Sequence, residues 1–178
     1  MLLQRVISTA LVFALAAPVT GLAQRPVPRP ADVATLDGIV HAYYDVISGP
    51  PGQAREWSRD SSLYIADIRF VSMGFEGGRP VPSIMDHGTY ARQSDPYFVK
   101  NGFFEQEIHR ETRRFGNIAH VFSTYESRNT PDGPVIARGI NSLNLFWDGS
   151  RWWIASATWD EERPGNPLPP EFLPPGGR

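Results

Sequence analysis

The stretch that decides the fold runs from Gly116 to Glu162: GNIAHVFSTYESRNTPDGPVIARGINSLNLFWDGSRWWIASATWDEE. Three runs rich in β-branched and aromatic residues are separated by clusters of Asn, Pro, Asp and Gly, which is typical of strands joined by turns. Residues 129–133 (NTPDG) close the first turn, and Asp148-Gly149 supplies the positive φ that a tight second turn needs. The pattern predicts an antiparallel meander.

None of these three runs alternates cleanly between apolar and polar residues. In the first, one face carries Ile118, His120, Phe122 and Thr124, and the other carries Ala119, Val121, Ser123 and Tyr125. A strand that is apolar on both sides is usually covered on both sides. The rest of the chain therefore has to supply at least one cover for this sheet.

The first 23 residues have the composition of a signal peptide. Arg5 gives a positive start, Val6 to Ala17 are almost wholly apolar, and Gly21-Leu22-Ala23 places small residues where a signal peptidase reads them. We expect cleavage after Ala23 and a secreted or periplasmic mature chain; an uncleaved anchor is the alternative. The chain has no cysteine, which excludes disulfides and lipid attachment through a lipobox.

Charge argues against several partners. Cleavage removes one of the 17 basic residues and none of the 19 acidic ones, and Lys100 is the only lysine. No basic block stands out, so we expect no nucleic-acid partner and no membrane contact after signal cleavage. Roughly 155 mature residues suit one domain with a real core.

The sequence divides into a signal peptide (1–23), a proline-rich linker (24–30), one domain (31–163) and a proline-rich tail (164–178). Helical spacing of apolar residues predicts a first helix that Asp32 caps. Gly and Pro clusters punctuate the segments that follow. The expected segments are helices at Asp32–Ser48, Gln53–Ser58 (Trp57 inward) and irregularly from Ser83 towards Phe98, strands at Asp67–Phe75 and Phe103–Phe115, and a turn at Glu76–Pro82.

This order of elements resembles the nuclear transport factor 2-like superfamily, including its SnoaL-like members. The resemblance rests on residues 39–44 (IVHAYY), 66–70 (ADIRF), 116–121 (GNIAHV) and 148–154 (DGSRWWI), and covers roughly Ala31 to Glu162. It implies an α+β fold in which a curved, mainly antiparallel sheet wraps N-terminal helices into a cone around a deep pocket. The superfamily contains isomerases, dehydratases, cyclases and non-catalytic proteins, so the fold implies no reaction.

Candidate chemistry centres on Asp86-His87-Gly88-Thr89-Tyr90. His87 could serve as a general base at the pocket mouth, with Tyr90 donating to a developing oxyanion. The pattern favours the alternative, a helix start in which Asp86 caps and His87 is solvated. No complete catalytic signature occurs in the chain.

Four polar residues share one face of the strand Phe103–Phe115: Glu105, Glu107, His109 and Glu111. Neighbours two apart on a strand stand about 7 Å from each other, so a metal would need further ligands. An exposed charged face or a Glu–Arg ladder through Arg113 or Arg138 is favoured. We predict no metal and no cofactor.

Arg138 and Asn141 interrupt an otherwise apolar strand, where an unpaired polar group is costly. They either face a polar pocket or pair with Glu126, Glu107 or Asp160. Large aromatic side chains are favoured as core, yet an apolar cone with a few polar groups is also the usual form of a small-molecule site. The predicted ligand-pocket residues are Tyr44, Trp57, Phe70, Glu107, Arg138, Asn141 and Trp159.

Three functions stay open. The leading one is an exported SnoaL-like protein that holds a small, mostly apolar molecule in the cone. A cofactor-free isomerase, lyase or hydratase would use His87 or a buried carboxylate, and would show a pocket acid or base with a shifted pKa. A dimeric interaction domain would fill its pocket with its own side chains.

Assembly follows from the doubly apolar strands. The helices are long enough to cover one face only, which leaves an apolar patch larger than monomers usually expose. A second copy packed sheet against sheet is the simplest cover and predicts a homodimer. The alternative is that the tail crosses this face with Leu168, Phe172 and Leu173 as its apolar contacts.

The signal peptide gives a direct test. Expressed with its native start in a bacterium, the chain should be recovered outside the cytoplasm with Gln24 as its first residue, because small residues precede that bond. Intact-mass measurement of the exported fraction checks the cut. Recovery of the chain from membranes with Met1 in place would refute the prediction.

Overall fold

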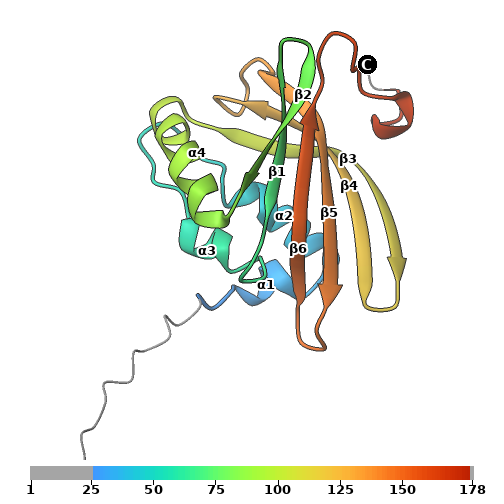
Figure 1. Ribbon diagram of the computed structural model, residues 1–178. Helices are drawn as coiled ribbons and strands as arrows, with labels where there is room; N and C mark the ends of the chain where they lie inside the picture. Colours follow the sequence, from blue (N-terminus) through green and yellow to red (C-terminus); the bar gives the residue numbers. More distant parts are fainter. Residues whose placement is uncertain (1–25, 177–178) are drawn as a thin grey trace, which may run out of the picture.

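A six-stranded, strongly curved sheet with strand order β2-β1-β6-β5-β4-β3 forms one side of the molecule (Figure 1). The computed structural model describes residues 26–176. Strand β1 runs parallel to β6, and all other neighbours are antiparallel. The predicted α+β class and the meander are confirmed. The strands are β1 (Phe70–Glu76), β2 (Arg79–Met85), β3 (Phe104–Phe115), β4 (Ile118–Arg128), β5 (Ala137–Trp147) and β6 (Trp152–Glu161).

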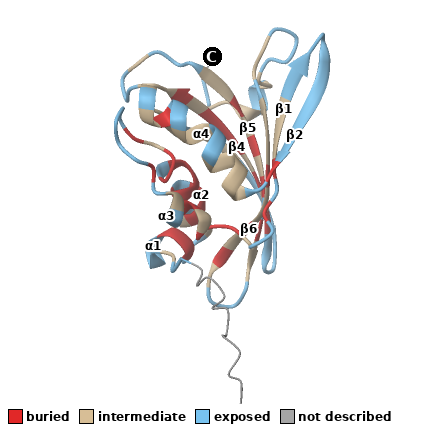
Figure 2. Cartoon of the chain, turned by 60° about the vertical axis from the view of Figure 1, so that its left-hand side comes forward, coloured by how far each residue is buried: buried red, intermediate tan, exposed pale blue. Residues whose placement is uncertain are grey.

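The helices lie on the concave side of this sheet, whereas β2 projects from the body and is almost wholly exposed (Figure 2). They are α1 (Pro30–Val33), α2 (Leu36–Asp45), α3 (Trp57–Ser61) and α4 (His87–Asn101). The first 23 residues, where a signal peptide is predicted, lie outside the described residues. Within residues 26–176, no helix is long and apolar enough to cross a membrane.

Helix α2 supplies the main cover of the concave face. Thr35 is its N-cap and accepts a hydrogen bond from the backbone N–H of Gly38 at 2.9 Å. Asp32 was predicted to cap this helix, and that is wrong: Asp32 lies in the separate α1, buried, with Arg59 of α3 at 2.7 Å. The ion pair ties α1 to α3.

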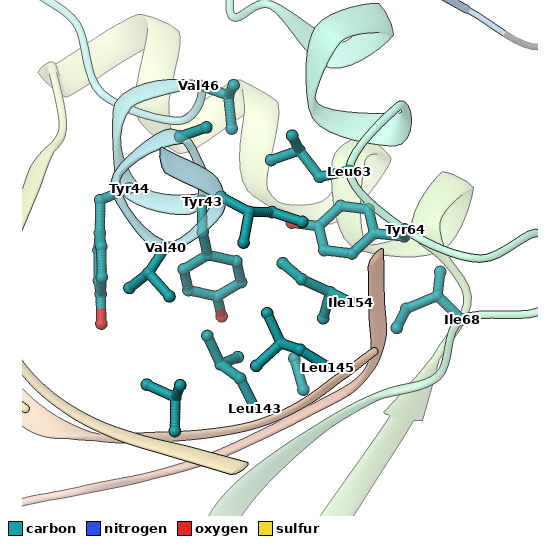
Figure 3. Packing of buried hydrophobic residues seen from close by; sticks show 14 of the residues in the cluster. Val40, Tyr43, Tyr44, Val46, Leu63, Tyr64, Ile68, Leu143, Leu145 and Ile154 are labelled. Atoms are coloured by element: carbon teal, nitrogen blue, oxygen red, sulfur yellow. The ribbon is translucent and has the colours of Figure 1, made fainter. Parts of the chain in front are cut away.

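The core forms where α2 meets the central strands (Figure 3). Ile39 and Val40 of α2 are fully buried, as are Val121 of β4, Leu143 of β5 and Ile154 of β6. Burial of each such side chain contributes about 1.5–3 kcal/mol to the stability of the fold. The same helix carries Tyr43 and Tyr44, whose hydroxyl groups point towards the sheet.

Strand β2 was missed in the sequence. Residues 76–82 were predicted to be a turn because of their glycines and prolines, but only Gly77 and Gly78 turn, with φ of 56° and 77°. Two positive φ values suit the tight hairpin between twisted strands. Pro80 and Pro82 then lie in an edge strand, where a missing N–H breaks no ladder on the open side.

Helices α3 and α4 also differ from the prediction. Helix α3 begins at Trp57 rather than at residue 53, and α4 begins after Asp86, whose carboxylate accepts a hydrogen bond from the N–H of Thr89 at 2.7 Å. Helix α4 ends at Gly102, with φ of 74°. A Cβ there would lie 2.5 Å from the carbonyl oxygen of Asn129, so only glycine fits.

A β-bulge at Ile108 changes the faces of β3. Glu107 pairs with Tyr125 and His109 with Thr124, so one residue of β3 has no partner on β4. The prediction that Glu105, Glu107, His109 and Glu111 share a face is therefore wrong. The first two lie on the concave face, and the last two lie on the outer face.

The tail crosses part of the outer, convex face. A short 3₁₀ helix, η1 (Pro170–Phe172), lies against β4, where Thr124 donates a hydrogen bond to the carbonyl oxygen of Phe172 at 2.7 Å. The rings of Phe122 and Phe172 are 5.4 Å apart. Phe172 therefore makes the contact expected of a tail that covers this face, and the homodimer stays a prediction.

Removal of the tail after Glu162 should raise the dimer fraction, because Phe122 loses its cover and exposed apolar surface favours association. Multi-angle light scattering on the mature chain and on the truncated chain measures the change. Phe172→Ala should act in the same direction, while Glu171→Ala, an exposed position on the same short helix, is the matched control. Equal association of all four proteins would contradict a covering role for the tail.

Candidate functional site

A cavity of about 370 Å³ lies between the helices and the concave face of the sheet. Helices α2 and α4 contribute Tyr43 and Tyr90, and the strands contribute polar and aromatic side chains in register. Such a mixture of aromatic walls and a few polar groups is the usual form of a small-molecule site. The side chains that the strands turn into the cavity include Glu105, Tyr125, Ser127, Asn141, Trp159 and Glu161.

Glu105 is the main titratable group of this cavity. Burial raises the pKa of its carboxyl to about 8, and the neighbouring charge of Glu161 pushes it the same way. Hydrogen bonds from Asn141 and Ser127 act in the opposite direction and are outweighed. Glu105 is half-buried by exposed area, as expected of a residue that lines an open cavity. Near neutral pH it is mostly the uncharged acid.

Tyrosine hydroxyl groups surround this acid. Burial raises the pKa of Tyr43, Tyr90 and Tyr125 well above the ordinary value, with the charge of Glu105 adding to the effect. These hydroxyls therefore stay protonated at any physiological pH and serve as hydrogen-bond donors. The cavity offers protonated oxygens and, among its titratable groups, no cation.

Asn141 joins helix α2 to the sheet beside Glu105. Its side-chain oxygen accepts a hydrogen bond from the hydroxyl of Tyr43 at 3.2 Å, and its Nδ2 donates to the hydroxyl of Tyr44 at 3.1 Å. Asn141 is only 2% exposed. Because a buried amide without partners is costly, these two bonds fix where α2 lies over β5.

A second hollow, of about 440 Å³, opens between α2 and β3. Glu105 lines it as well as the first cavity. Its wall includes Tyr44, Glu107 and Arg110. Arg110 pairs with Glu107 at 2.7 Å and with Asp37 at 2.5 Å, so its charge is already neutralised.

Solved structures with this architecture exist. A candidate ketosteroid isomerase from Parabacteroides distasonis has a TM-score of 0.51 at 10% identity, over 79% of this chain and 98% of that one. The β subunit of a candidate aromatic-ring-hydroxylating dioxygenase from Novosphingobium aromaticivorans has a TM-score of 0.53 at 14% identity, over 73% and 88%. An NTF2-like protein of unknown function from Silicibacter pomeroyi scores 0.49 at 14% identity, over 72% and 94%.

The chain has the nuclear transport factor 2-like fold. No protein-family model matches its sequence, and no curated protein matches it. At these identities the likeness concerns the fold alone. The chemistry of this NTF2-like cone depends on its own side chains.

His87 lies outside the lining of both cavities. Its Nε2 is 2.8 Å from a carboxylate oxygen of Asp60, and Tyr64 donates to the other oxygen at 2.8 Å. Asp60 is fully buried, while the His87 side chain is 20% exposed. The prediction of a solvated His87 is wrong because Asp60, which helix α3 holds beneath it, provides a partner. The prediction that Asp86 caps the helix is confirmed.

The other residues predicted for the site fall into four groups. Tyr90, Asn141 and Trp159 line the cone cavity, and Tyr44 and Glu107 line the second hollow. Trp57 and Phe70 pack around Tyr90 with ring centroids 5.9 Å and 4.9 Å away, and line neither cavity. Arg138 lies on the outer face, paired with Glu162 at 2.7 Å.

Sequence reasoning placed Glu105 in a charged strand face and gave it no role in the pocket. The residues on β4 could have indicated that Glu105 faces the pocket. Ser127 pairs with Glu105 and Tyr125 pairs with Glu107, and both Ser127 and Tyr125 face inward. No group of three or more His, Asp or Glu residues suited to hold a metal ion occurs within residues 26–176.

Because the pKa of Glu105 is raised, the stability of the folded chain should fall as pH rises. Its pKa in the folded chain, about 8, lies above the ordinary value of 4.5, so the folded state binds the proton more tightly than the unfolded state does. The contribution of this proton to the free energy of unfolding is complete below about pH 4.5. It is lost as pH rises to about 8, by up to about 1.4 kcal/mol per pH unit.

Chemical unfolding at several pH values between about 5 and 9 measures this decline. Glu105→Gln keeps the shape and removes the proton, so its stability should change less across the window. Glu111→Gln, on the outer face of the same strand, is the matched control and should behave as the parent chain does. An unaltered pH dependence in Glu105→Gln would contradict the assignment.

Proposed function

We propose that this chain binds a small, mostly apolar molecule in the cone cavity and that the neutral carboxyl of Glu105 donates a hydrogen bond to an oxygen of that molecule. The observation that carries the proposal is an acid with a pKa of about 8 in a cavity walled by tyrosine and tryptophan. A carboxyl that is neutral near pH 7 is a donor, which a carboxylate is not.

The shape and wall of the cavity support a ring-bearing ligand. Trp159 and Tyr90 lie 6.1 Å apart in an edge-to-face arrangement and present apolar surface beside the polar groups. A volume of about 370 Å³ is within the range of small-molecule sites. The titratable groups of the cavity include no cation, which disfavours an anionic ligand.

A second function, cofactor-free acid–base catalysis, is favoured by the same pKa. An acid that titrates near the working pH exchanges a proton with a substrate at little cost. As the carboxylate, Glu105 would take a proton from a carbon next to a carbonyl, and a tyrosine hydroxyl would stabilise the oxygen that gains charge. One solved structure with this fold is described as a candidate ketosteroid isomerase, which agrees with such a reaction class.

Export is part of the proposal. The composition of residues 1–23 supports passage through a secretion pathway, followed by folding of the domain in the periplasm or outside the cell. The absence of cysteine means that this folding requires no disulfide chemistry.

A matched pair of probes tests the binding proposal. Calorimetric titration compares 2-acetylnaphthalene, a neutral ketone, with 2-ethylnaphthalene, which has a similar shape and no oxygen. At about pH 6 the ketone should bind roughly tenfold more tightly, because one good hydrogen bond corresponds to about 1.4 kcal/mol. The preference should disappear above about pH 9, where Glu105 no longer carries a proton to donate.

Two variants complete this test. Glu105→Gln should keep the preference, since an amide still donates, and should make it independent of pH. Glu105→Ala should lose the preference. Equal binding of both probes to the parent chain at every pH would overturn the proposal.

Catalysis is tested with the same ketone in D₂O. Exchange of its methyl protons, followed by NMR, should be faster with the parent chain than with Glu105→Gln if Glu105 acts as a base. Tight binding without accelerated exchange would leave binding as the function and exclude the catalytic alternative for this class of ketone.

A further inference from the structure

A chain of buried hydrogen bonds runs across the concave face from the second hollow to the cone cavity. Glu107 accepts a hydrogen bond from Ser123, whose hydroxyl lies 2.6 Å from that of Tyr44. The hydroxyl of Tyr44 in turn accepts from Asn141 at 3.1 Å. Ser123, Tyr44 and Asn141 are all at most 4% exposed, so these groups depend on one another for partners.

The direction of this chain follows from counting hydrogens. The Glu107 carboxylate accepts from Nε of Arg110 through both oxygens, at 2.9 and 3.0 Å, and has no hydrogen to give. Ser123 must therefore donate its single hydroxyl hydrogen to Glu107, and its oxygen accepts a hydrogen bond from Tyr44. The hydroxyl hydrogen of Tyr44 is then used, so the Tyr44 oxygen needs a donor on its other side.

Only one orientation of the Asn141 amide satisfies this requirement. The NH₂ group has to face Tyr44, which leaves the carbonyl oxygen facing Tyr43, whose hydroxyl donates to it at 3.2 Å. The reversed amide would place two acceptors against each other at Tyr44. In a buried network such a clash costs the full desolvation of the unpaired groups.

We propose that Glu107 is a positioning residue for the cone cavity: through Ser123 and Tyr44, its carboxylate fixes the Asn141 amide with the NH₂ group towards Tyr44 and Glu105. The inference rests on the proposed function for its use, since it specifies which ligand atom the cavity accepts. It stands on hydrogen-bond geometry that is independent of any ligand.

The orientation of the Asn141 amide affects Glu105. With one amide hydrogen on Tyr44, the second is left to face Glu105, whose pKa both Asn141 and Ser127 lower. A neutral carboxyl that meets donors on one side can turn its O–H to the cavity, where an accepting oxygen such as a ketone, ester or ether fits. The groups that influence the titration of Glu105 or are influenced by it include Tyr43, Tyr44, Tyr90, Tyr125, Asn141, Ser127 and Glu161.

Tyr44→Phe and Ser123→Ala test the proposal without altering any charge, and Glu107→Gln tests the direction of the chain. The readout is the side-chain amide of Asn141 in ¹⁵N-labelled protein. In the parent chain both amide hydrogens are held, so they should exchange slowly with water. Each variant should speed their exchange by about tenfold, the factor that the loss of one hydrogen bond of about 1.4 kcal/mol gives.

Glu107→Gln has a particular signature, because glutamine both donates and accepts. It permits the chain to run in reverse, so the amide of Asn141 should lose its single orientation and give more than one pair of resonances. A carboxylate at this position forbids the reversed chain.

Ser142→Ala is the matched control, because that hydroxyl lies on the outer face with His120 and outside the network. It should leave the Asn141 amide unchanged. Unchanged exchange in Tyr44→Phe and Ser123→Ala, with both variants folded, would overturn the proposal. The amide readout needs no ligand, so it is independent of the probe experiment. If the parent chain shows no ketone preference, that result contradicts the proposed function but not the hydrogen-bond network.

The pH profile of ketone preference gives a second readout. Disorder of the Asn141 amide removes a donor that stabilises the Glu105 carboxylate, so the midpoint should move to higher pH in Tyr44→Phe. Packing alone would not move it. A midpoint equal to that of the parent chain would show that Tyr44 does not position Asn141.

Discussion

The position of helix α2 over the sheet depends on one buried amide. Asn141 of β5 binds Tyr43 and Tyr44, neighbours on α2, with opposite ends of its side chain. Apolar packing of Ile39 and Val40 provides most of the free energy that holds α2 on the sheet, but this packing is not directional. The amide adds direction, because a shift of the helix along the strand would break both of its hydrogen bonds to the tyrosines. The cone cavity keeps its shape for the same reason.

Environment assigns different roles to two carboxyl groups on one strand. Glu105 and Glu107 are two residues apart on the concave face of β3. Glu107 reaches Arg110 and Ser123 and serves as a charged anchor for the network. No cation is among the groups that act on the pKa of Glu105, and burial leaves it a neutral acid at pH 7. The bulge at Ile108 separates this pair from His109 and Glu111, which it turns to the other face.

Much of the fold could be predicted from local sequence. The three strands of the opening stretch and the stripe on α2 have strong patterns, because β-branched runs and helical spacing act over short distances. Strand β2 could not be predicted in this way, since Pro80 and Pro82 argue for a turn unless the strand is known to lie at the sheet edge. Edge position is a property of the whole sheet, and no local window contains it.

The site was less accessible to prediction for a related reason. The role of Glu105 depends on a one-residue bulge and on burial by tyrosines from α2, α4 and β4, none of which leaves a local signal. Asp60 and His87 are 27 residues apart and meet only because α3 lies beneath the start of α4. Asn141 was recognisable, since a polar residue within an apolar strand requires a partner wherever it points.

The function proposed for the cavity depends on the neutral state of Glu105, and the ¹³C chemical shift of its carboxyl group measures that state directly. A titration of selectively labelled protein, with the resonance assigned by its loss in Glu105→Gln, gives the pKa of this one group. We expect a midpoint near 8. A midpoint close to the ordinary 4.5 would mean a charged carboxylate in the cavity, and would contradict both its role as a donor and the ligand class inferred from it.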